Sequence, residues 1–244
     1  MSVPRRTSSR HKLFGVNGPG LLAVTDGEIS FLWSFIQGSI MISETWNALL
    51  RGYGFCERHA WIHISVEMSF RHEYLLGPTI LYAELIDKSL LAISASQTIG
   101  LHSLMRQLRA AGPCFLCTMN VTNASAGACP QARLNRGRDN SQLRNFASKL
   151  QPMWRISVCP DCSGEDRDQM APRRCRQHLL AAMKARTTVD IVAQRNVLRD
   201  LSDRVGRYQR SFSSGAKASD QDRAALIAAI GWCSGWRPLL AQLS

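Results

Sequence analysis

Four pairs of potential metal ligands, all with the same spacing, constrain this 244-residue chain more than any other feature. Each pair has two residues between its ligands: Cys56 and His59, Cys114 and Cys117, Cys159 and Cys162, and Cys175 and His178. Two intervening residues let a tight turn, or the first turn of a helix, direct both side chains at one ion. A structural zinc ion takes four ligands, so each pair is half a site and the pairs must combine.

The last two pairs are neighbours in the sequence. "CPDC" is followed after twelve residues by "CRQH", giving a C-x2-C-x12-C-x2-H pattern that is close to known zinc-site spacings. We therefore predict one zinc site formed by Cys159, Cys162, Cys175 and His178.

The two remaining pairs complement each other and predict a second zinc site with the pair order reversed. Its ligands would be Cys56, His59, Cys114 and Cys117. The two pairs are separated by about 55 residues, a distance that two antiparallel helices could span by folding back. Two alternatives stay open here: Cys129 could replace His59, or His63 could compete with His59 from one helical turn away.

The phrase "GFCERHAW" with the later C-x-x-C pairs and the closing "CRQHL" resembles a family of bacterial proteins with paired CPxC and GFCxxHA modules. These proteins are predicted to bind zinc, and the resemblance covers roughly residues 52–180. It implies metal binding and no enzyme. The pair "CFLC" departs from the family pattern because it lacks the proline, and no C-x-x-C lies upstream of Cys56.

Hydrophobic periodicity predicts a mostly α fold with two zinc-knuckle or treble-clef-like Cys3His modules. A capping box over Thr25–Glu28 begins a helical pattern that reaches residue 50, and further helices are expected near 79–110, 140–150, 179–205 and 224–243. Cys233 is expected in the core. The predicted segments are a flexible basic tail (1–12), an N-terminal helical domain (13–128), a zinc-knuckle module (129–186) and C-terminal basic helices (187–244).

The net charge of +12 is concentrated in the second half of the chain. Residues 1–113 carry ten Lys/Arg against eight Asp/Glu, whereas residues 114–244 carry twenty against ten. Such asymmetry predicts a polyanionic partner, nucleic acid above all. The expected contacts are Arg173, Arg174, Arg176, Lys184, Arg186, Arg195, Arg199, Arg207 and Arg210.

The sequence predicts a cytoplasmic binding protein rather than an enzyme. No secretory signal or membrane span is recognisable, and in a reducing compartment cysteines at this spacing are metal ligands rather than disulfides. A Cys3His set fills every zinc position, leaving none for a substrate. The leading hypothesis is a zinc-stabilised, transcriptional regulator-like protein. One alternative is an accessory factor that docks a protein partner through Trp232 and Trp236; another is a thiol-based redox or metal sensor.

Overall fold

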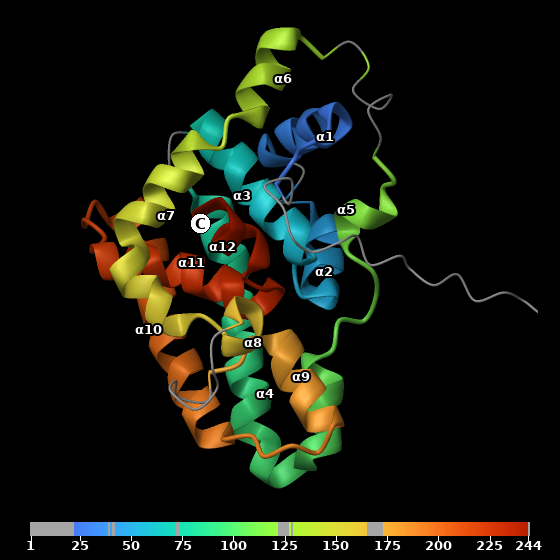
Figure 1. Ribbon diagram of the computed structural model, residues 1–244, viewed down its shortest axis with the longest axis vertical. Helices are drawn as coiled ribbons and strands as arrows, with labels where there is room; N and C mark the ends of the chain where they lie inside the picture. The colour runs from blue at the N-terminus through green and yellow to red at the C-terminus, as the bar shows by residue number, and fades with distance from the viewer. Residues whose placement is uncertain are drawn as a thin grey trace, which may run out of the picture.

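The computed structural model describes residues 22–38, 40, 42–71, 74–121, 127, 129–164 and 173–243, and these contain helices and no strand. The predicted mostly α fold is therefore confirmed (Figure 1), while the predicted basic tail lies outside the described residues. The helices are α1 (Asp26–Ile36), α2 (Ser43–Gly52), α3 (Glu57–Arg71), α4 (Leu76–Leu108), α5 (Phe115–Thr118), α6 (Gln131–Arg138), α7 (Ser141–Trp154), the 3-10 helix η3 (Arg155–Ser157), α8 (Pro160–Ser163), α9 (Arg176–Lys184), α10 (Ile191–Ser214), α11 (Asp220–Ser234) and α12 (Arg237–Leu243).

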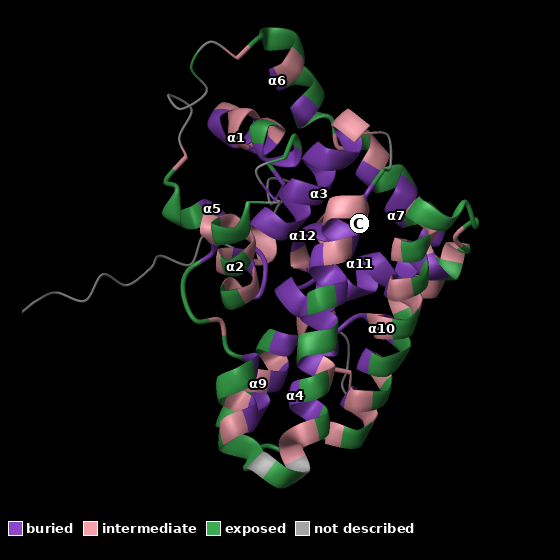
Figure 2. Cartoon of the chain, turned by 180° about the vertical axis from the view of Figure 1, so that it is seen from behind, coloured by how far each residue is buried: buried purple, intermediate pink, exposed green. Residues whose placement is uncertain are grey.

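Helices α3 and α11 form the centre of the molecule. Residues 59–69 of α3 and 224–234 of α11 are buried without interruption, so neither helix presents a solvent face over these stretches. A helix that is buried on every side belongs in the core. Helix α11 packs against α3, α4, α7, α9 and α10, and Figure 2 shows both helices almost entirely in the buried class.

The tryptophans near the C-terminus belong to this core. The Trp236 ring stacks on Trp154 with centroids 5.7 Å apart and also lies 6.5 Å from the Trp61 ring. Trp232 and Trp236 are only 4% and 0% exposed, so the prediction that they dock a partner is wrong. The prediction that Cys233 is a core residue is confirmed, since it is fully buried.

Two helices that the sequence predicts as continuous are interrupted. The pattern up to residue 50 divides into α1 and α2, because the chain leaves the helix at Gln37 and Gly38. The last helix divides into α11 and α12 at Gly235, whose φ of 118° suits glycine. A Cβ atom there would also lie 2.4 Å from Oε1 of Glu57, so the close approach of α3 excludes a larger residue.

The long predicted helix also changes direction. Gly100 has φ 76° and ψ 165°, outside the helical region, and separates residues 76–99 from residues 101–108. We call residues 101–108 the return segment of α4, because they turn back and lie beside α9 (Figure 1). The return segment leads directly to α5, which carries two of the predicted ligands.

One hydrophobic core joins the predicted segments. Leu32 and Trp61 from the first, Leu150 from the second and Leu198 and Leu226 from the third all belong to the same buried cluster. Within the described part of the chain, no helix is long and apolar enough to span a membrane.

Candidate metal centres

All four ligand pairs occupy the same place in local structure, which explains their spacing. In each pair the first ligand directly precedes a helix and the second lies three residues on, in the first turn; the helices are α3, α5, α8 and α9. The carbonyl of the first ligand accepts an early helical hydrogen bond, as Cys114 O does from Thr118 N at 3.0 Å. The first turn of a helix also presents free N–H groups, which favour thiolates nearby.

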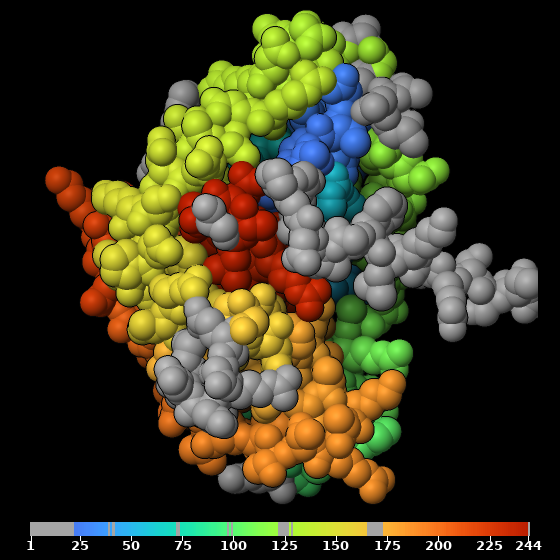
Figure 3. Space-filling model, viewed as in Figure 1, coloured from blue at the N-terminus to red at the C-terminus, as the bar shows by residue number. Residues whose placement is uncertain are grey.

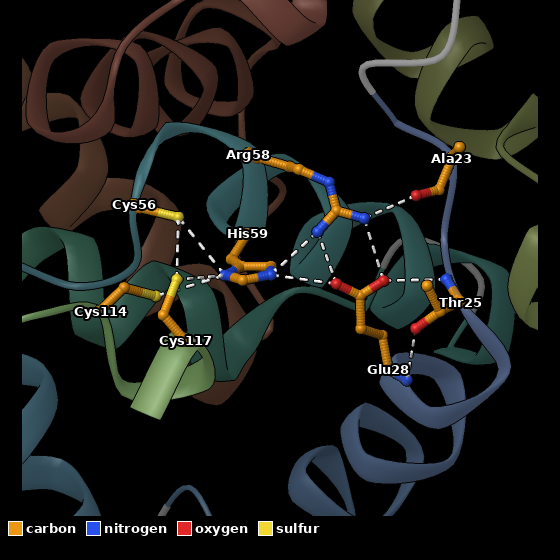
Figure 4. Close-up of polar contacts among 8 residues, drawn as sticks. All are labelled: Ala23, Thr25, Glu28, Cys56, Arg58, His59, Cys114 and Cys117. Carbon is orange, nitrogen blue, oxygen red and sulfur yellow. Dashed lines mark hydrogen bonds and ion pairs between the residues drawn. The ribbon is translucent and has the colours of Figure 1, made fainter. Parts of the chain in front are cut away.

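The structure brings two pairs together in what we call the first metal group, shown in Figure 4. Nδ1 of His59 faces the three sulfurs: it lies 3.4 Å from Sγ of Cys56, 3.5 Å from Sγ of Cys114 and 3.3 Å from Sγ of Cys117. The sulfurs of Cys56 and Cys117 are 3.9 Å apart, too far for a disulfide. The first metal group therefore comprises Cys56, His59, Cys114 and Cys117.

A buried carboxylate orients the histidine of this group. Oε1 of Glu28 lies 3.0 Å from Nε2 of His59, on the ring edge opposite the sulfurs. The guanidinium of Arg58 donates to both oxygens of Glu28 and to the carbonyl of Ala23. With Nε2 donating its proton to the carboxylate, Nδ1 is left with a free lone pair directed at the three sulfurs, as a metal-binding histidine requires.

Glu28 also takes part in the capping box at the start of α1, and this fixes the position of its side chain. The predicted capping box is confirmed: Glu28 N donates to Thr25 Oγ1 at 3.2 Å, and Thr25 N donates to Glu28 Oε2 at 2.8 Å. Burial would raise the pKa of Glu28, but hydrogen bonds from His59 and Arg58 outweigh burial and hold that pKa well below its ordinary value. The carboxylate facing the histidine is thus ionised.

The second metal group combines the other two pairs. Nδ1 of His178 lies 3.4 Å from Sγ of both Cys159 and Cys162 and 3.2 Å from Sγ of Cys175. The Sγ atoms of Cys162 and Cys175 are 3.8 Å apart. The second metal group is therefore Cys159, Cys162, Cys175 and His178, the set that the sequence predicts.

The thiols of each group influence one another strongly. Hydrogen bonds from Cys56 and His59 lower the pKa of Cys114 to about 3, whereas the hydrogen bond to Cys114 raises the pKa of Cys56. In the second group, the contact with Cys159 raises the pKa of Cys162 to about 12. The chain's own groups thus favour one thiolate per cluster, and a cation would let the other thiols ionise.

The alternatives to His59 lie outside the first metal group. His63 is fully buried, with its ring 5.0 Å from the Phe55 ring and Nε2 3.2 Å from Oε2 of Glu67. Cys129 is also absent from the residues whose ligand atoms lie within 4.8 Å of one another. His59, and neither Cys129 nor His63, is therefore the fourth residue of the first metal group.

Arg176 connects the neighbourhoods of the two metal groups. Its Nε donates to the carbonyl of Cys233 and its Nη1 to the carbonyl of Leu108, both at 2.9 Å, and the guanidinium lies 4.4 Å above the Tyr53 ring. Arg176 is 5% exposed, so its prediction as a nucleic-acid contact is wrong. The physical reason is that position 176 faces inward on α9, where these carbonyls need a donor.

The other predicted nucleic-acid contacts are more exposed, but several have partners. Arg207 pairs with Asp222 at 2.9 Å and Arg174 with Asp161 at 3.4 Å, while Arg173 donates to the carbonyl of Ile156. Arg195 is half-buried. The remaining predicted contacts are exposed, and within the described residues they make no ion pair. They are Lys184, Arg186, Arg199 and Arg210.

Comparison with protein-family models, with curated proteins and with solved structures gives no match. The resemblance to predicted zinc-binding proteins therefore stays a prediction. The structure does bring together two groups of one histidine and three cysteines that could hold a metal ion. Glu28 is the partner that sequence reasoning missed; its only signal was the capping box, which explains it fully as a helix-capping residue.

Proposed function

We propose that both metal groups bind zinc and that these sites are structural. A tetrahedral zinc ion with Zn–S bonds of about 2.3 Å and Zn–N bonds of about 2.0 Å separates two sulfurs by about 3.8 Å and a sulfur from a nitrogen by about 3.5 Å. The sulfur pairs lie 3.9 and 3.8 Å apart in the two groups, and the sulfur–nitrogen distances run from 3.2 to 3.5 Å. Three thiolates and an imidazole are also the donor set that zinc prefers over harder cations.

The observation that carries the proposal is that each group is complete. Four protein atoms surround each centre, so no coordination position is left for water or substrate, and the metals would stabilise a fold rather than catalyse. The function of such a protein is binding by its surface.

Metal analysis of the purified full-length chain tests the zinc sites. We expect two zinc ions per chain, falling to one in Cys114→Ser and one in Cys175→Ser. The matched control is Cys129→Ser, which should keep both ions because Cys129 belongs to neither group. Full zinc content in Cys175→Ser would contradict the second site, and loss of zinc from Cys129→Ser would contradict the assignment of the first.

We further propose that the partner is nucleic acid, bound through the basic second half of the chain. The support is the net charge of +10 over residues 114–244, the difference between its twenty basic and ten acidic residues. Arg199 and Arg210 lie on α10 with exposed side chains, where they could neutralise phosphates.

A fluorescence titration with a labelled oligonucleotide over a salt series tests this proposal. Each phosphate contact adds about 0.9 to the slope of log K against log salt for duplex DNA, so Arg199→Glu with Arg210→Glu should weaken binding and flatten the slope by about 2. The matched control reverses two exposed charges in the first half of the chain, Arg51→Glu with Arg106→Glu. Binding that is weak and independent of salt would exclude nucleic acid as the partner.

A second candidate function, a thiol-based sensor, is favoured by the exposure of the first metal group. In the first group Cys117 is exposed, Cys56 half-buried and Cys114 buried, whereas in the second group Cys162 is half-buried and Cys159 and Cys175 are buried. Peroxide would oxidise two accessible thiolates to a disulfide, take up two protons to form two waters, and release the ion. Zinc release under mild peroxide, reversed by a thiol reductant, supports the sensor; retention of both ions rejects it.

A further inference from the structure

The return segment of α4 and helix α9 lie at the end of the molecule opposite α6 (Figures 1 and 3). A groove lies between them. It has a volume of about 580 Å³, and we call it the α4–α9 groove. Apolar side chains line it together with positive or titratable ones, and we call its three basic residues, Arg106, Arg109 and Lys184, the rim. Its lining is His102, Met105, Arg106, Arg109, Leu180, Ala181 and Lys184.

The lining residues follow helical spacing on both walls. On the return segment, Met105 and Arg106 lie three and four positions after His102, the spacing of one helix face, and Arg109 follows just beyond the end of the helix. On α9, Leu180 and Lys184 are four positions apart. Two neighbouring helices with facing stripes of this kind form a seat into which the side chains of a third helix can pack.

The charge of the groove has one sign. Arg106, Arg109 and Lys184 are exposed, and among the described residues none of them makes an ion pair. No acidic residue belongs to the lining, and exposed Arg186 follows Lys184 just beyond α9. This differs from α10, where Arg204 and Arg207 are paired with Asp200 and Asp222.

We propose that the α4–α9 groove binds an acidic amphipathic helix of a partner protein. The apolar face of such a helix would cover Met105, Leu180 and Ala181, and its flanking carboxylates would meet the arginines and the lysine of the rim. A nucleic-acid backbone could pair with the basic rim, but it offers no apolar surface to cover Met105, Leu180 and Ala181. The proposal is independent of nucleic-acid binding by α10.

Both walls of the groove are attached to the metal groups. Helix α9 begins with the Cys175–His178 pair, and the return segment continues to Cys114. Arg176 ties the two walls together through the carbonyl of Leu108. The groove therefore keeps its width as long as both groups hold their ions, and peptide binding should require the zinc-loaded chain.

The test is fluorescence anisotropy with the zinc-loaded full-length chain and a labelled synthetic peptide of about four helical turns. The peptide carries leucines at i, i+3, i+4 and i+7 with glutamates on either side, and the control peptide has the same composition in scrambled order. We expect the patterned peptide to bind and the scrambled one to bind at least about tenfold more weakly, because only the first presents an apolar face with acidic edges.

Two kinds of variant locate the binding. Arg106→Glu with Lys184→Glu reverses the rim and should weaken binding at least about tenfold, a loss of about 1.4 kcal/mol, while Lys149→Glu with Lys217→Glu reverses as much charge elsewhere and should change nothing. Ala181→Trp fills the groove without changing charge and should also abolish binding. Zinc content and helical circular dichroism confirm that each variant is folded.

Three results would overturn the proposal. The first is equal binding of the scrambled peptide, and the second is undiminished binding to the rim or Ala181→Trp variants. The third is the absence of peptide binding while an oligonucleotide, or a second copy of the chain detected by sedimentation, loses affinity in these same variants. In that case the groove would bind nucleic acid or a second copy of the chain.

Discussion

The two metal groups have the same ligand set but hold it together in different ways. In the second group, Cys159 and His178 are 19 positions apart, so one short stretch of the chain supplies every ligand. In the first group, Cys56 and Cys117 are 61 positions apart and depend on α4 turning back. The longer loop costs about 1 kcal/mol more conformational entropy to close. The comparison shows that a site can be assembled by local sequence or by tertiary structure, and that the second route needs additional support.

The supporting contacts differ accordingly. The first group has a carboxylate, Glu28, that comes from another helix and fixes the His59 ring. The second group has an ion pair between Asp161 and Arg174, 3.4 Å long, which joins its two halves beside the ligands themselves. The first group is thus supported by long-range contacts, whereas the second has this local ion pair beside the long-range hydrogen bonds of Arg176.

The largest effect on stability is expected when one buried ligand is removed from each group. Cys114→Ser and Cys175→Ser should each lower the free energy of unfolding by several kcal/mol, because structural zinc contributes about 10–16 kcal/mol in small domains whose net stability is far lower. Cys114→Ser should be the less destabilising by about 1 kcal/mol, since opening the longer loop returns more conformational entropy to the chain. Urea unfolding with zinc present measures both.

The control for these variants is Cys129→Ser, which should change stability by less than about 0.5 kcal/mol. If Cys114→Ser proves clearly more damaging than Cys175→Ser, then loop length does not decide how much each ion stabilises the chain.

An intermediate effect is expected from Glu28→Gln. The amide keeps the cap of α1 but removes the charge that orients His59, so zinc affinity of the first group should fall about 10- to 100-fold while the second group is unchanged. Competition with a chromophoric chelator resolves the two affinities.

Thr25→Ala is the matched control for the carboxylate. It removes the hydroxyl that caps α1 and should cost about 1 kcal/mol of stability without altering zinc affinity. Equal losses of affinity in the two variants would mean that Glu28 acts only by placing α1.

The smallest effect is expected at the ion pair of the second group. Asp161→Asn should weaken zinc binding there by less than about 1 kcal/mol, since the pair is partly exposed, with side chains 12% and 18% accessible, and is screened by water. Asp200→Asn, which removes an exposed pair with Arg204 on α10, should leave both affinities as they are. A loss of tenfold or more in Asp161→Asn would show that the loop alone does not hold the second group.

The sequence predicted the helices and the membership of both groups well, for a physical reason. Helical periodicity and i, i+3 ligand spacing are local properties, and every ligand pair lies at the start of a helix. The interruptions at Gln37 and Gly235 were not predicted, because apolar residues continue at helical spacing past both positions. At the last break, Oε1 of Glu57 from α3 accepts a hydrogen bond from Arg237 N at the start of α12, a contact that no local pattern contains.

The second role of Glu28 and the burial of Arg176 could not be predicted for the same reason. The capping box alone accounts for a glutamate at position 28. Its second role arises only because α3 brings His59 within 3.0 Å of it. Arg176 follows two arginines that remain partly exposed, and only the packing of α9 on Leu108 and Cys233 turns it inward. A run of basic residues in the sequence therefore shows where positive charge is concentrated, but it does not show which of the side chains face the solvent.

The 61 positions between Cys56 and Cys117 also have a consequence for biosynthesis. At a synthesis rate of about 5–20 residues per second, Cys56 and His59 leave the ribosome on the order of several seconds before their partners exist. During that interval the nascent chain offers an incomplete chelating pair, open to any soft cation or oxidant. The second group, by contrast, is completed within about one to four seconds of its first cysteine, so its first pair stays incomplete for a much shorter time.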